Sequence, residues 1–411
     1  MSPNRRFVIV GGGLAGAKTA EALREKDFDG SIVLLSGEDH LPYERPPLSK
    51  EHVAGKKSLA DFTVHHGDWY RDHHIDLRLG TAVTALDREA HQVQLPDGST
   101  LGYDKLALAT GSRSRRPPIP GSDAAGVHYL RTIEESDALI GALVEGSRLV
   151  VIGAGWIGLE VAAQARERGV VVTVIEAAAL PLLGPLGPEM GTVFAELHRE
   201  HGVDLHFDAT VEAITTDGGR ATGVLLATGD VLPADAVLVA VGAQPNVELA
   251  EQAGLAVDGG VLVDASLATS DPDIVAVGDV AAVQHPVLGT RIRVEHWANT
   301  LNQPATAAAT MLGRAAQYAN LPYFFTDQYD LGMEYVGHAP AGGYDRLVVR
   351  GDVTRREFVA FWLGADNRVL AGMNVNIWDV TDDVKALIAS GSPVDPGLLA
   401  DPAVALTDVT A

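Results

Sequence analysis

Two stretches of the sequence follow one pattern: "FVIVGGGLAGAKTA" at residues 7–20 and "LVVIGAGWIGLEVA" at residues 149–162. Each is a short apolar run, then Gly-x-Gly-x-x-Gly, then residues that favour a helix. The first glycine makes a tight strand-to-helix turn, the second lets the backbone approach a pyrophosphate, and the third allows close helix–strand packing. The repetition therefore predicts two dinucleotide-binding units. The glycines are Gly11, Gly13 and Gly16 in the first copy and Gly153, Gly155 and Gly158 in the second.

The residues after each motif support this prediction, which the glycine spacing alone leaves weak. The first motif is followed by a helix expected to end near Lys26 and by a strand that ends near Glu38, with Ser36 and Asp39 close by. The second is followed by a helix and by a strand that ends at Glu176. An acidic residue about 20 positions beyond the glycines is where a ribose hydroxyl is held, and the phosphates lie at the helix N-terminus.

Length, composition and charge fit this interpretation. The chain of 411 residues is long enough for two or three domains, and its 46% hydrophobic and 21% charged residues are ordinary for a globular protein. The N-terminal "MSPNRRFVIV" runs directly into the first expected strand, without a signal sequence, and no segment resembles a membrane span, so we expect a cytoplasmic protein. The net charge of −23 argues against nucleic acid or an anionic membrane as a partner, although solubility explains it equally well.

The chain contains no cysteine. This excludes disulfide-reductase chemistry, a sulfenic acid centre, cysteine-ligated zinc and a cysteine-held iron–sulfur cluster within the chain. If two dinucleotides exchange electrons here, the electrons have to leave without a protein thiol.

A second internal repeat predicts the fold class. Residues 93–113 and 223–246 each read as two strands joined by a turn, followed by a buried strand that ends in "ATG" or "AVG". We therefore expect an α/β protein with two Rossmann-like domains. The strand in 273–281 is expected to return to the first of them. From about 321 onward, a hairpin around 365–367 and a helix near 382–390 predict a C-terminal α+β domain.

The expected domain limits follow from these segments. A first segment of the first dinucleotide-binding domain covers 1–112, and the second dinucleotide-binding domain covers 113–242. A second segment of the first domain covers 243–320, and the C-terminal domain covers 321–411. The proline-rich stretch "SRSRRPPIPG" at 112–121 suits a crossover between domains.

Over essentially its whole length the chain resembles the FAD-dependent NADH:ferredoxin reductases that serve bacterial cytochromes P450 and ring-hydroxylating dioxygenases. These enzymes are related in fold to glutathione reductase and apoptosis-inducing factor. The residues that carry the resemblance are, in family order, "VGGGLAG", "LPYERPPLSK", "LALATGSR", "VIGAGWIGLE", "VGAQPN", "AVGDVA", "EHWANTLNQP" and "FFTDQYD".

The resemblance implies that the first motif binds FAD and the second NADH, that hydride passes from nicotinamide C4 to flavin N5, and that single electrons then pass to a small iron–sulfur ferredoxin. The residues it assigns to FAD are Gly11, Gly13, Leu14, Ala15, Gly16, Glu38, Arg45, Lys50, Val83, Arg131, Asp279 and Trp297. Those it assigns to NADH are Gly153, Gly155, Ile157, Gly158, Glu176 and Gly242.

Within this set the resemblance gives Lys50 and Glu160 the catalytic role, as an ion pair beside flavin N5. A cation there stabilises negative charge on the reduced flavin, and a carboxylate partner keeps a buried lysine charged. The alternative is that both lie on the protein surface. Asp279 is assigned to the ribityl chain, or is a helix N-cap, and the backbone of Trp297 is assigned to the pyrimidine edge of the flavin.

Several alternatives stay open. Phe325 occupies a position that is often tryptophan in relatives, so it either lies at the flavin edge or packs in the core. The histidines of "HHGDWYRDHHID" lack the carboxylate or cysteine set of a structural metal site, so no metal is expected. Arg291 and Arg293 are the only hint of a basic patch for an acidic ferredoxin. A flavin NADH oxidase, an apoptosis-inducing-factor-like protein and a remnant dinucleotide-binding scaffold are the competing functions.

Overall fold

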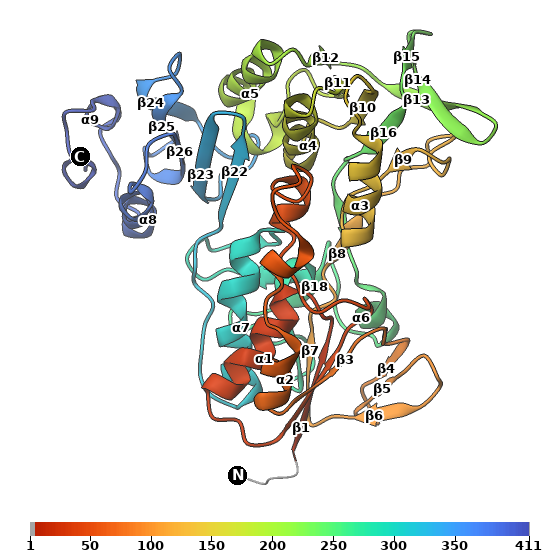
Figure 1. Ribbon diagram of the computed structural model, residues 1–411. Coiled ribbons are helices and arrows are strands. Elements are labelled where there is room, and N and C mark those ends of the chain that lie inside the picture. Colours follow the sequence, from red (N-terminus) through yellow and green to blue (C-terminus); the bar gives the residue numbers. More distant parts are fainter. Residues whose placement is uncertain (1–4, 411) are drawn as a thin grey trace. The chain divides into compact units, whose positions relative to one another are not determined.

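The structure is a computed structural model that describes residues 5–410, and they form two compact units (Figure 1). Unit 1 contains the chain up to Glu44, Leu59–Arg113 and Gln244–Pro322. Unit 2 contains Arg45–Ser58, Ser114–Ala243 and the chain from Tyr323 onward. The limits that we assigned to cofactor-binding domains stay predictions.

Unit 1 is built on a five-stranded parallel sheet in the order β19-β7-β1-β2-β3. Parallel neighbours need a crossover connection, and α1 (Leu14–Glu25) supplies it between β1 and β2. Because β19 pairs with β7, the expected return of the 273–281 segment to the first dinucleotide unit is confirmed. The strands are β1 (Arg6–Val10), β2 (Ser31–Leu35), β3 (Ile75–Arg78), β7 (Lys105–Leu108) and β19 (Ile274–Ala276).

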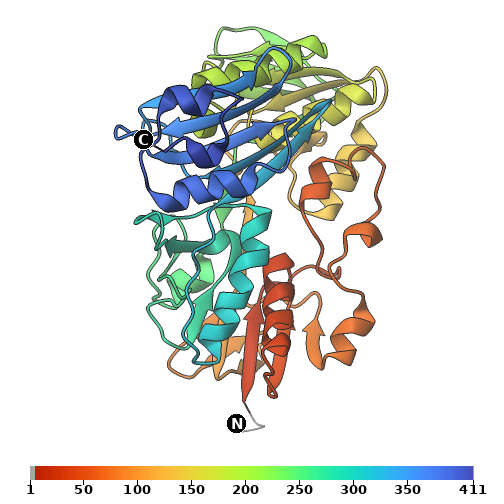
Figure 2. The same ribbon diagram turned by 90° about the vertical axis from the view of Figure 1, so that its left-hand side faces the viewer.

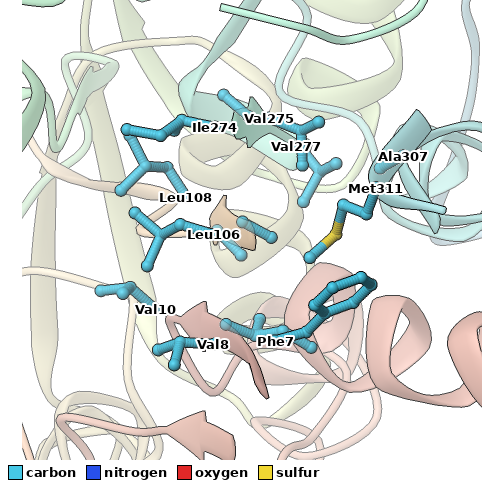
Figure 3. Close-up of a cluster of buried hydrophobic side chains, with 14 of the residues drawn as sticks. Phe7, Val8, Val10, Leu106, Leu108, Ile274, Val275, Val277, Ala307 and Met311 are labelled. Carbon is cyan, nitrogen blue, oxygen red and sulfur yellow. The ribbon is translucent and has the colours of Figure 1, made fainter. Parts of the chain in front are cut away.

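The core of unit 1 lies where this sheet meets α7 (Trp297–Met311). Figure 3 shows side chains of β1, β7 and β19 converging with Ala307 and Met311 of that helix. Helices α1 and α7 lie side by side (Figure 2). Small buried residues on both helices, such as Ala17 and Ala308, allow that close packing. The strands read as continuous apolar runs because the sheet is buried.

The remaining elements of unit 1 include the meander β4-β5-β6 that the repeat predicted and a small sheet β18-β20-β21. Their bounds are η2 (Leu59–Phe62), α2 (Gly67–Asp72), β4 (Ala85–Asp87), β5 (Gln92–Gln94), β6 (Thr100–Gly102), α6 (Glu248–Gln252), β18 (Val261–Val263), η3 (Gly278–Val280), β20 (Ala281–Gln284) and β21 (Arg291–Ile292). The chain passes between the units after Glu44, after Ser58, within β8 (Ser112–Ser114), within β17 (Ala243–Pro245) and after Pro322.

Unit 2 repeats the architecture with a parallel sheet in the order β12-β11-β10-β16-β9. Helix α4 (Trp156–Glu167) joins β10 to β11, and the meander β13-β14-β15 precedes the returning strand β16. The bounds are η1 (Pro46–Ser49), β9 (Val127–His128), α3 (Ile133–Ala142), β10 (Arg148–Ile152), β11 (Val171–Ile175), α5 (Leu183–Glu200), β12 (Asp204–His206), β13 (Val211–Asp217), β14 (Arg220–Leu226), β15 (Val231–Pro233) and β16 (Ala236–Val239).

The C-terminal part of unit 2 is an antiparallel sheet in the order β22-β23-β26-β25-β24, packed against α8 (Thr381–Ser390). The other bounds are β22 (Tyr323–Gln328), β23 (Leu331–Gly337), β24 (Arg346–Asp352), β25 (Glu357–Leu363), β26 (Val369–Val375), α9 (Pro396–Ala400) and η4 (Leu406–Asp408). The predicted hairpin and the predicted helix near 382–390 are both confirmed, but α8 is not the last helix, because α9 and η4 follow it. Among residues 5–410, no helix has the length and apolar character needed to cross a membrane.

Candidate functional site: two dinucleotide cradles and a buried ion pair

The first glycine motif forms an open cradle at the start of α1. Gly11 has φ +122°, and a Cβ there would lie 2.1 Å from the carbonyl oxygen of Ala109. A Cβ on Gly16 would lie 1.9 Å from the carbonyl oxygen of Gly11. Gly13, in contrast, has no protein atom within 4 Å of its would-be Cβ. Two glycines are thus required by the protein's own packing, and the middle one faces space that a ligand can fill.

The second motif has the same construction at the start of α4. Gly153 has φ +104°, and its Cβ would lie 2.5 Å from the carbonyl oxygen of Ala240. A Cβ on Gly158 would lie 2.2 Å from the carbonyl oxygen of Gly153, whereas Gly155 again faces open space. Neither α1 nor α4 has a side-chain N-cap, so the N–H groups of both first turns are available to a phosphate.

The acidic residues expected to meet a ribose lie at the ends of the second strands. Glu38 follows β2, and its Oε2 accepts a hydrogen bond of 2.6 Å from the Tyr43 hydroxyl. Glu176 follows β11, and its two oxygens accept from the backbone N–H groups of Ala154 (2.7 Å) and Ala178 (2.9 Å). Because Ala154 belongs to the glycine motif, Glu176 helps to hold the cradle in place.

Other residues assigned to FAD lie in unit 1. Asp279 is buried in η3, where its Oδ2 accepts from the Ser112 hydroxyl (2.9 Å). Asp279 lies inside η3, whose N-cap is Val277, so the alternative that it is a helix N-cap is wrong. Helix α7 begins at Trp297 and has no acidic residue in its first turn. The N-terminus of α7 therefore favours negative charge, as the flavin assignment requires. Val83 packs against the core of unit 1, and Leu14 and Ala15 are buried at the start of α1.

The assigned catalytic pair is formed within unit 2. Lys50, at the end of η1, donates from Nζ to Oε1 of Glu160 on α4 at 2.5 Å. Glu160 also accepts from the hydroxyls of Ser49 on Oε2 (2.5 Å) and Thr326 on Oε1 (2.6 Å). Lys50 is 8% exposed and Glu160 4% exposed. The alternative that both residues lie on the surface is therefore wrong.

The aromatic residues of β22 divide between two roles. Phe324 is half-buried and packs between Trp156 (ring centroids 4.6 Å apart) and Tyr335 (5.2 Å). The Phe325 ring centroid lies 5.3 Å from the Lys50 ammonium, within the range of a cation–π contact. Phe325 therefore neighbours the ion pair.

The assigned FAD residues are divided between the two units. Arg45, Lys50 and Arg131 belong to unit 2, and the Arg45 guanidinium donates to the backbone carbonyl of Arg131. The residues assigned to NADH also lie in unit 2, including the exposed Ile157 and Gly242, which has φ +94°. The structure brings Lys50 and Glu160 into direct contact and leaves the other assignments as predictions.

Sequence reasoning missed the groups that support Glu160. Thr326, Gln328 and His198 are all fully buried, and none was a candidate site residue. A signal was present in "FFTDQYD": alternation in a strand places Thr326 and Gln328 on one face, and buried polar residues on such a face need partners.

The histidine-rich segment and the two arginines make local contacts. His65 stacks on Trp69 (ring centroids 3.7 Å apart) and donates from Nε2 to the Glu21 carboxylate at 3.1 Å. In the described part of the chain, no group of three or more histidine, aspartate or glutamate residues could hold a metal ion. Arg291 donates to the carbonyl oxygens of two strands, and Arg293 pairs with Glu295, so both guanidinium groups are engaged within unit 1.

Residues 5–307 match the family described as pyridine nucleotide-disulphide oxidoreductase, and residues 323–410 match the reductase C-terminal family. The chain belongs to the pyridine nucleotide-disulphide oxidoreductase family. It is 45% identical to the ferredoxin–NAD(+) reductase component of an anthranilate 1,2-dioxygenase system from Burkholderia cepacia, over 97% of this chain and 98% of that protein. It is 40% identical to putidaredoxin reductase from Pseudomonas putida, over 100% of this chain and 98% of that protein.

Solved structures agree with the sequence relatives. The reductase in a covalent putidaredoxin reductase–putidaredoxin complex is similar with a TM-score of 0.95 and 39% identity, covering 99% of this chain and 98% of the other. The ferredoxin reductase of the CYP199A2 system from Rhodopseudomonas palustris gives 0.94 and 36%, covering 99% and 100%. The predicted family and fold class are confirmed, and the chain is an oxidoreductase that uses FAD and NAD(H).

Proposed function

We propose that the protein is a ferredoxin–NAD(+) reductase that takes hydride from NADH and passes single electrons to a small iron–sulfur ferredoxin, which feeds a cytochrome P450 or a dioxygenase. The observation that carries the proposal is the buried Lys50–Glu160 pair in a chain with two open glycine cradles and no cysteine. Family relatives of this kind that reduce disulfides need protein thiols, and this chain has none.

The residues fit both cofactors. The open space at Gly13 and at Gly155, with uncapped helix N-termini beside it, suits a pyrophosphate in each cradle. We assign FAD to the cradle in unit 1, with Asp279 and the N-terminus of α7, and NADH to the cradle in unit 2, with Glu176. When bound, FAD supplies the conversion of one two-electron input into two one-electron outputs.

The protein's own contribution is electrostatic. Lys50 carries a buried positive charge whose cost is offset by Glu160, and three donors fix the orientation of that carboxylate. A cation held in this way stabilises negative charge that develops near it during hydride transfer. Because its position is already fixed, no side chain has to reorient in the transition state. In this proposal Lys50 does not donate or accept a proton during the reaction. It acts through its positive charge.

The domain assignment is part of the proposal. Segments 1–112 and 243–320 bind FAD, 113–242 binds NADH, and 321–411 contributes β22 with Thr326 beside Glu160. Because NADH is an intracellular coenzyme, the proposal places the enzyme in the cytoplasm.

The experiment is NADH-driven reduction of a panel of purified [2Fe–2S] and other small ferredoxins, with oxygen consumption recorded in parallel. We expect fast reduction of at least one ferredoxin and slow oxygen consumption in its absence. High oxygen turnover without ferredoxin would instead identify an NADH oxidase. A slow reaction with NADH and a long-lived charge-transfer complex would identify an apoptosis-inducing-factor-like protein, in which the flavin gates association with other proteins.

A further inference from the structure

A chain of hydrogen bonds leads away from Glu160 through the interior of unit 2. The Thr326 hydroxyl donates to Oε1 of Glu160 (2.6 Å) and accepts from Nε2 of Gln328 (3.2 Å). The amide oxygen of Gln328 lies 2.8 Å from Nε2 of His198. The Tyr329 hydroxyl lies 3.4 Å from Nδ1 of His198 and ends the chain.

The three intermediate side chains are 0% exposed: Thr326, Gln328 and His198. They come from two elements, β22 and α5, and they reach a carboxylate on a third, α4. Burying a hydroxyl, an amide and an imidazole costs free energy unless each is hydrogen-bonded, and here they bond to one another and to Glu160. Apolar side chains could fill the same interior without this requirement.

The direction of every bond follows from the charge of Glu160. An ionised carboxylate only accepts hydrogen bonds, so the Thr326 hydroxyl donates to it and offers its own lone pair to the Gln328 amide N–H. The Gln328 oxygen then faces His198 and needs an N–H from its Nε2. This leaves Nδ1 of His198 as an acceptor, with the Tyr329 hydroxyl as its donor. All the donors therefore point toward Glu160.

The protonation of His198 agrees with this direction. Burial lowers the pKa of His198 to about 4; the bond to Gln328 opposes this shift, and the nearby His201 contributes to it. His198 is therefore neutral near pH 7 and carries a single ring N–H, which the chain requires on Nε2.

We propose that Thr326, Gln328 and His198 are positioning residues that hold Glu160, and through it Lys50, in the orientation used for hydride transfer. Thr326 and Lys50 donate to the same oxygen, Oε1, so the hydroxyl fixes the atom to which the ammonium is bound. The assignment rests on the proposed function, because that function gives the Lys50 charge its role.

The direction of the chain can be tested without any turnover. In holoenzyme labelled with ¹⁵N-histidine, the His198 ring signals are identified by their absence in His198→Phe. We expect the wild-type ring to be neutral with its proton on Nε2, and Gln328→Leu to abolish this single-tautomer signal. A His198 that is charged at pH 7, or that carries its proton on Nδ1, would overturn the proposal.

The effect on chemistry is tested by stopped-flow reduction of the bound flavin, with NADH and with NADH deuterated at C4 so that the hydride step is identified. Thr326→Val removes the donor to Glu160 at nearly constant volume, and we expect about a tenfold slower reduction at saturating NADH, with the Kd for NADH within about twofold of wild type. Thr326→Ser restores a hydroxyl, and we expect it to recover most of the rate.

Thr215→Val is the matched control, because Thr215 lies on β13 in the same unit and, within residues 5–410, its hydroxyl bonds only to that of Thr222 (3.1 Å). It should reduce at the wild-type rate. If Thr326→Val and Thr326→Ser differ in melting temperature but both reduce at the wild-type rate, the chain is structural and the proposal is wrong. A wild-type flavin that NADH does not reduce would instead refute the proposed function itself, so the two failures are distinct.

Discussion

The two glycine motifs have nearly the same backbone and different surroundings. Gly13 at the start of α1 has φ −78° and ψ −177°, and Gly155 at the start of α4 has φ −81° and ψ −177°. Seven residues beyond the first glycine of each motif, however, α1 carries Lys18 and α4 carries Glu160. Lys18 is part of a half-exposed pair with Glu21 (2.7 Å), whereas Glu160 is buried against Lys50.

The acidic residues that follow β2 and β11 are held differently as well. Glu38 is held by a side chain, the Tyr43 hydroxyl, whereas Glu176 is held by two backbone N–H groups, one of which belongs to its own glycine motif. The comparison teaches that the motif makes a pyrophosphate cradle and nothing more specific. Which dinucleotide is bound, and whether chemistry occurs beside it, depends on the helix and strand that follow.

The largest expected effect separates the two cradles. Gly13→Ala and Gly155→Ala each add a methyl group that meets no protein atom within 4 Å, so both variants should fold. We expect Gly13→Ala to be purified without FAD, because the methyl occupies the place of the pyrophosphate. Gly155→Ala should remain yellow, with a KM for NADH raised about tenfold.

Flavin absorbance and thermal unfolding of the two purified variants check this prediction. A Gly155→Ala protein that has lost FAD, beside a yellow Gly13→Ala protein, would reverse our assignment of the cradles. Equal melting temperatures for Gly13→Ala and for wild-type protein from which FAD has been removed would show that the methyl group acts on the ligand and leaves the fold intact.

The next largest effect concerns Lys50, the partner of Glu160 on α4. Lys50→Met removes the charge that Glu160 holds, and we expect hydride transfer to slow by about 10²–10³, since a preorganised charge contributes about 2–4 kcal/mol to the transition state. NADH binding should change little. Lys18→Met, on the helix of the other motif, is the control and should reduce at the wild-type rate. Stopped-flow flavin reduction measures both, and a wild-type rate for Lys50→Met would make the pair structural.

The preference for NADH over NADPH tests the role of Glu176 at the end of β11. We expect the wild type to favour NADH over NADPH by at least about tenfold in kcat/KM, because the Glu176 carboxylate repels a 2′-phosphate and "AAALPLLGPLG" after it has no basic residue. Two like charges about 4 Å apart cost about 4 kcal/mol at an effective dielectric of about 20, and salt lowers this in a half-buried site.

Glu176→Ala should reduce the preference for NADH, chiefly because kcat/KM for NADPH rises. Because Ala154 and Ala178 lose their acceptor, the KM for NADH should also rise severalfold. Glu167→Ala, an exposed carboxylate at the end of α4, is the control and should leave the coenzyme ratio unchanged. Comparing kcat/KM for both coenzymes at a fixed ferredoxin concentration decides the matter. Equal use of the two coenzymes by the wild type would contradict the role of Glu176.

Much of the fold could be predicted because short sequence segments specify it. The glycine motifs, the acidic strand ends and the paired meanders each specify a short segment, and the fold class that they predicted is confirmed. The family and the cofactors that the resemblance implied are confirmed as well. Helix α5 was not predicted. Its first turns contain Gly184, Gly187 and two prolines, and the helix bends at Gly187, which has φ +81°. Glycine and proline disfavour a helix, so the sequence does not indicate one here. The helix is stabilised by burial of its apolar face in the folded unit.

The site could be predicted only in part. Lys50 and Glu160 were recognised because each belongs to a motif, and their contact is seen in the structure. Thr326, Gln328 and His198 belong to elements that meet only after folding, 130 residues apart in the case of His198 and Gln328. A single sequence carries no signal for such a contact beyond the polar residues on a strand face. The remaining cofactor contacts stay predictions.

The smallest effect that we expect comes from a contact that both repeats share. The backbone N–H at the start of the first strand donates to an aspartate ahead of the returning strand: Arg6 to Asp104 (2.6 Å) and Arg148 to Asp235 (2.9 Å). In the second repeat the Arg148 guanidinium also donates, from Nε (3.0 Å) and Nη2 (2.7 Å). The side-chain bonds from Arg148 first, and its backbone bond second, lower the pKa of Asp235 to about 2.

Asp235→Asn should therefore lower the melting temperature at pH 7 more than Asp104→Asn does, by about 1–2 °C, since exposed ion pairs contribute little. An asparagine oxygen can still accept the backbone bond in both variants, so the difference reports the guanidinium contacts. A carboxylate whose pKa is lowered on folding stabilises the protein above its unfolded pKa of 3.8, and this contribution is lost as the pH falls toward 2. The gap between wild type and Asp235→Asn should close over that interval. A gap that persists unchanged at pH 2, in melts that remain reversible, would show that shape rather than charge makes the second repeat differ from the first.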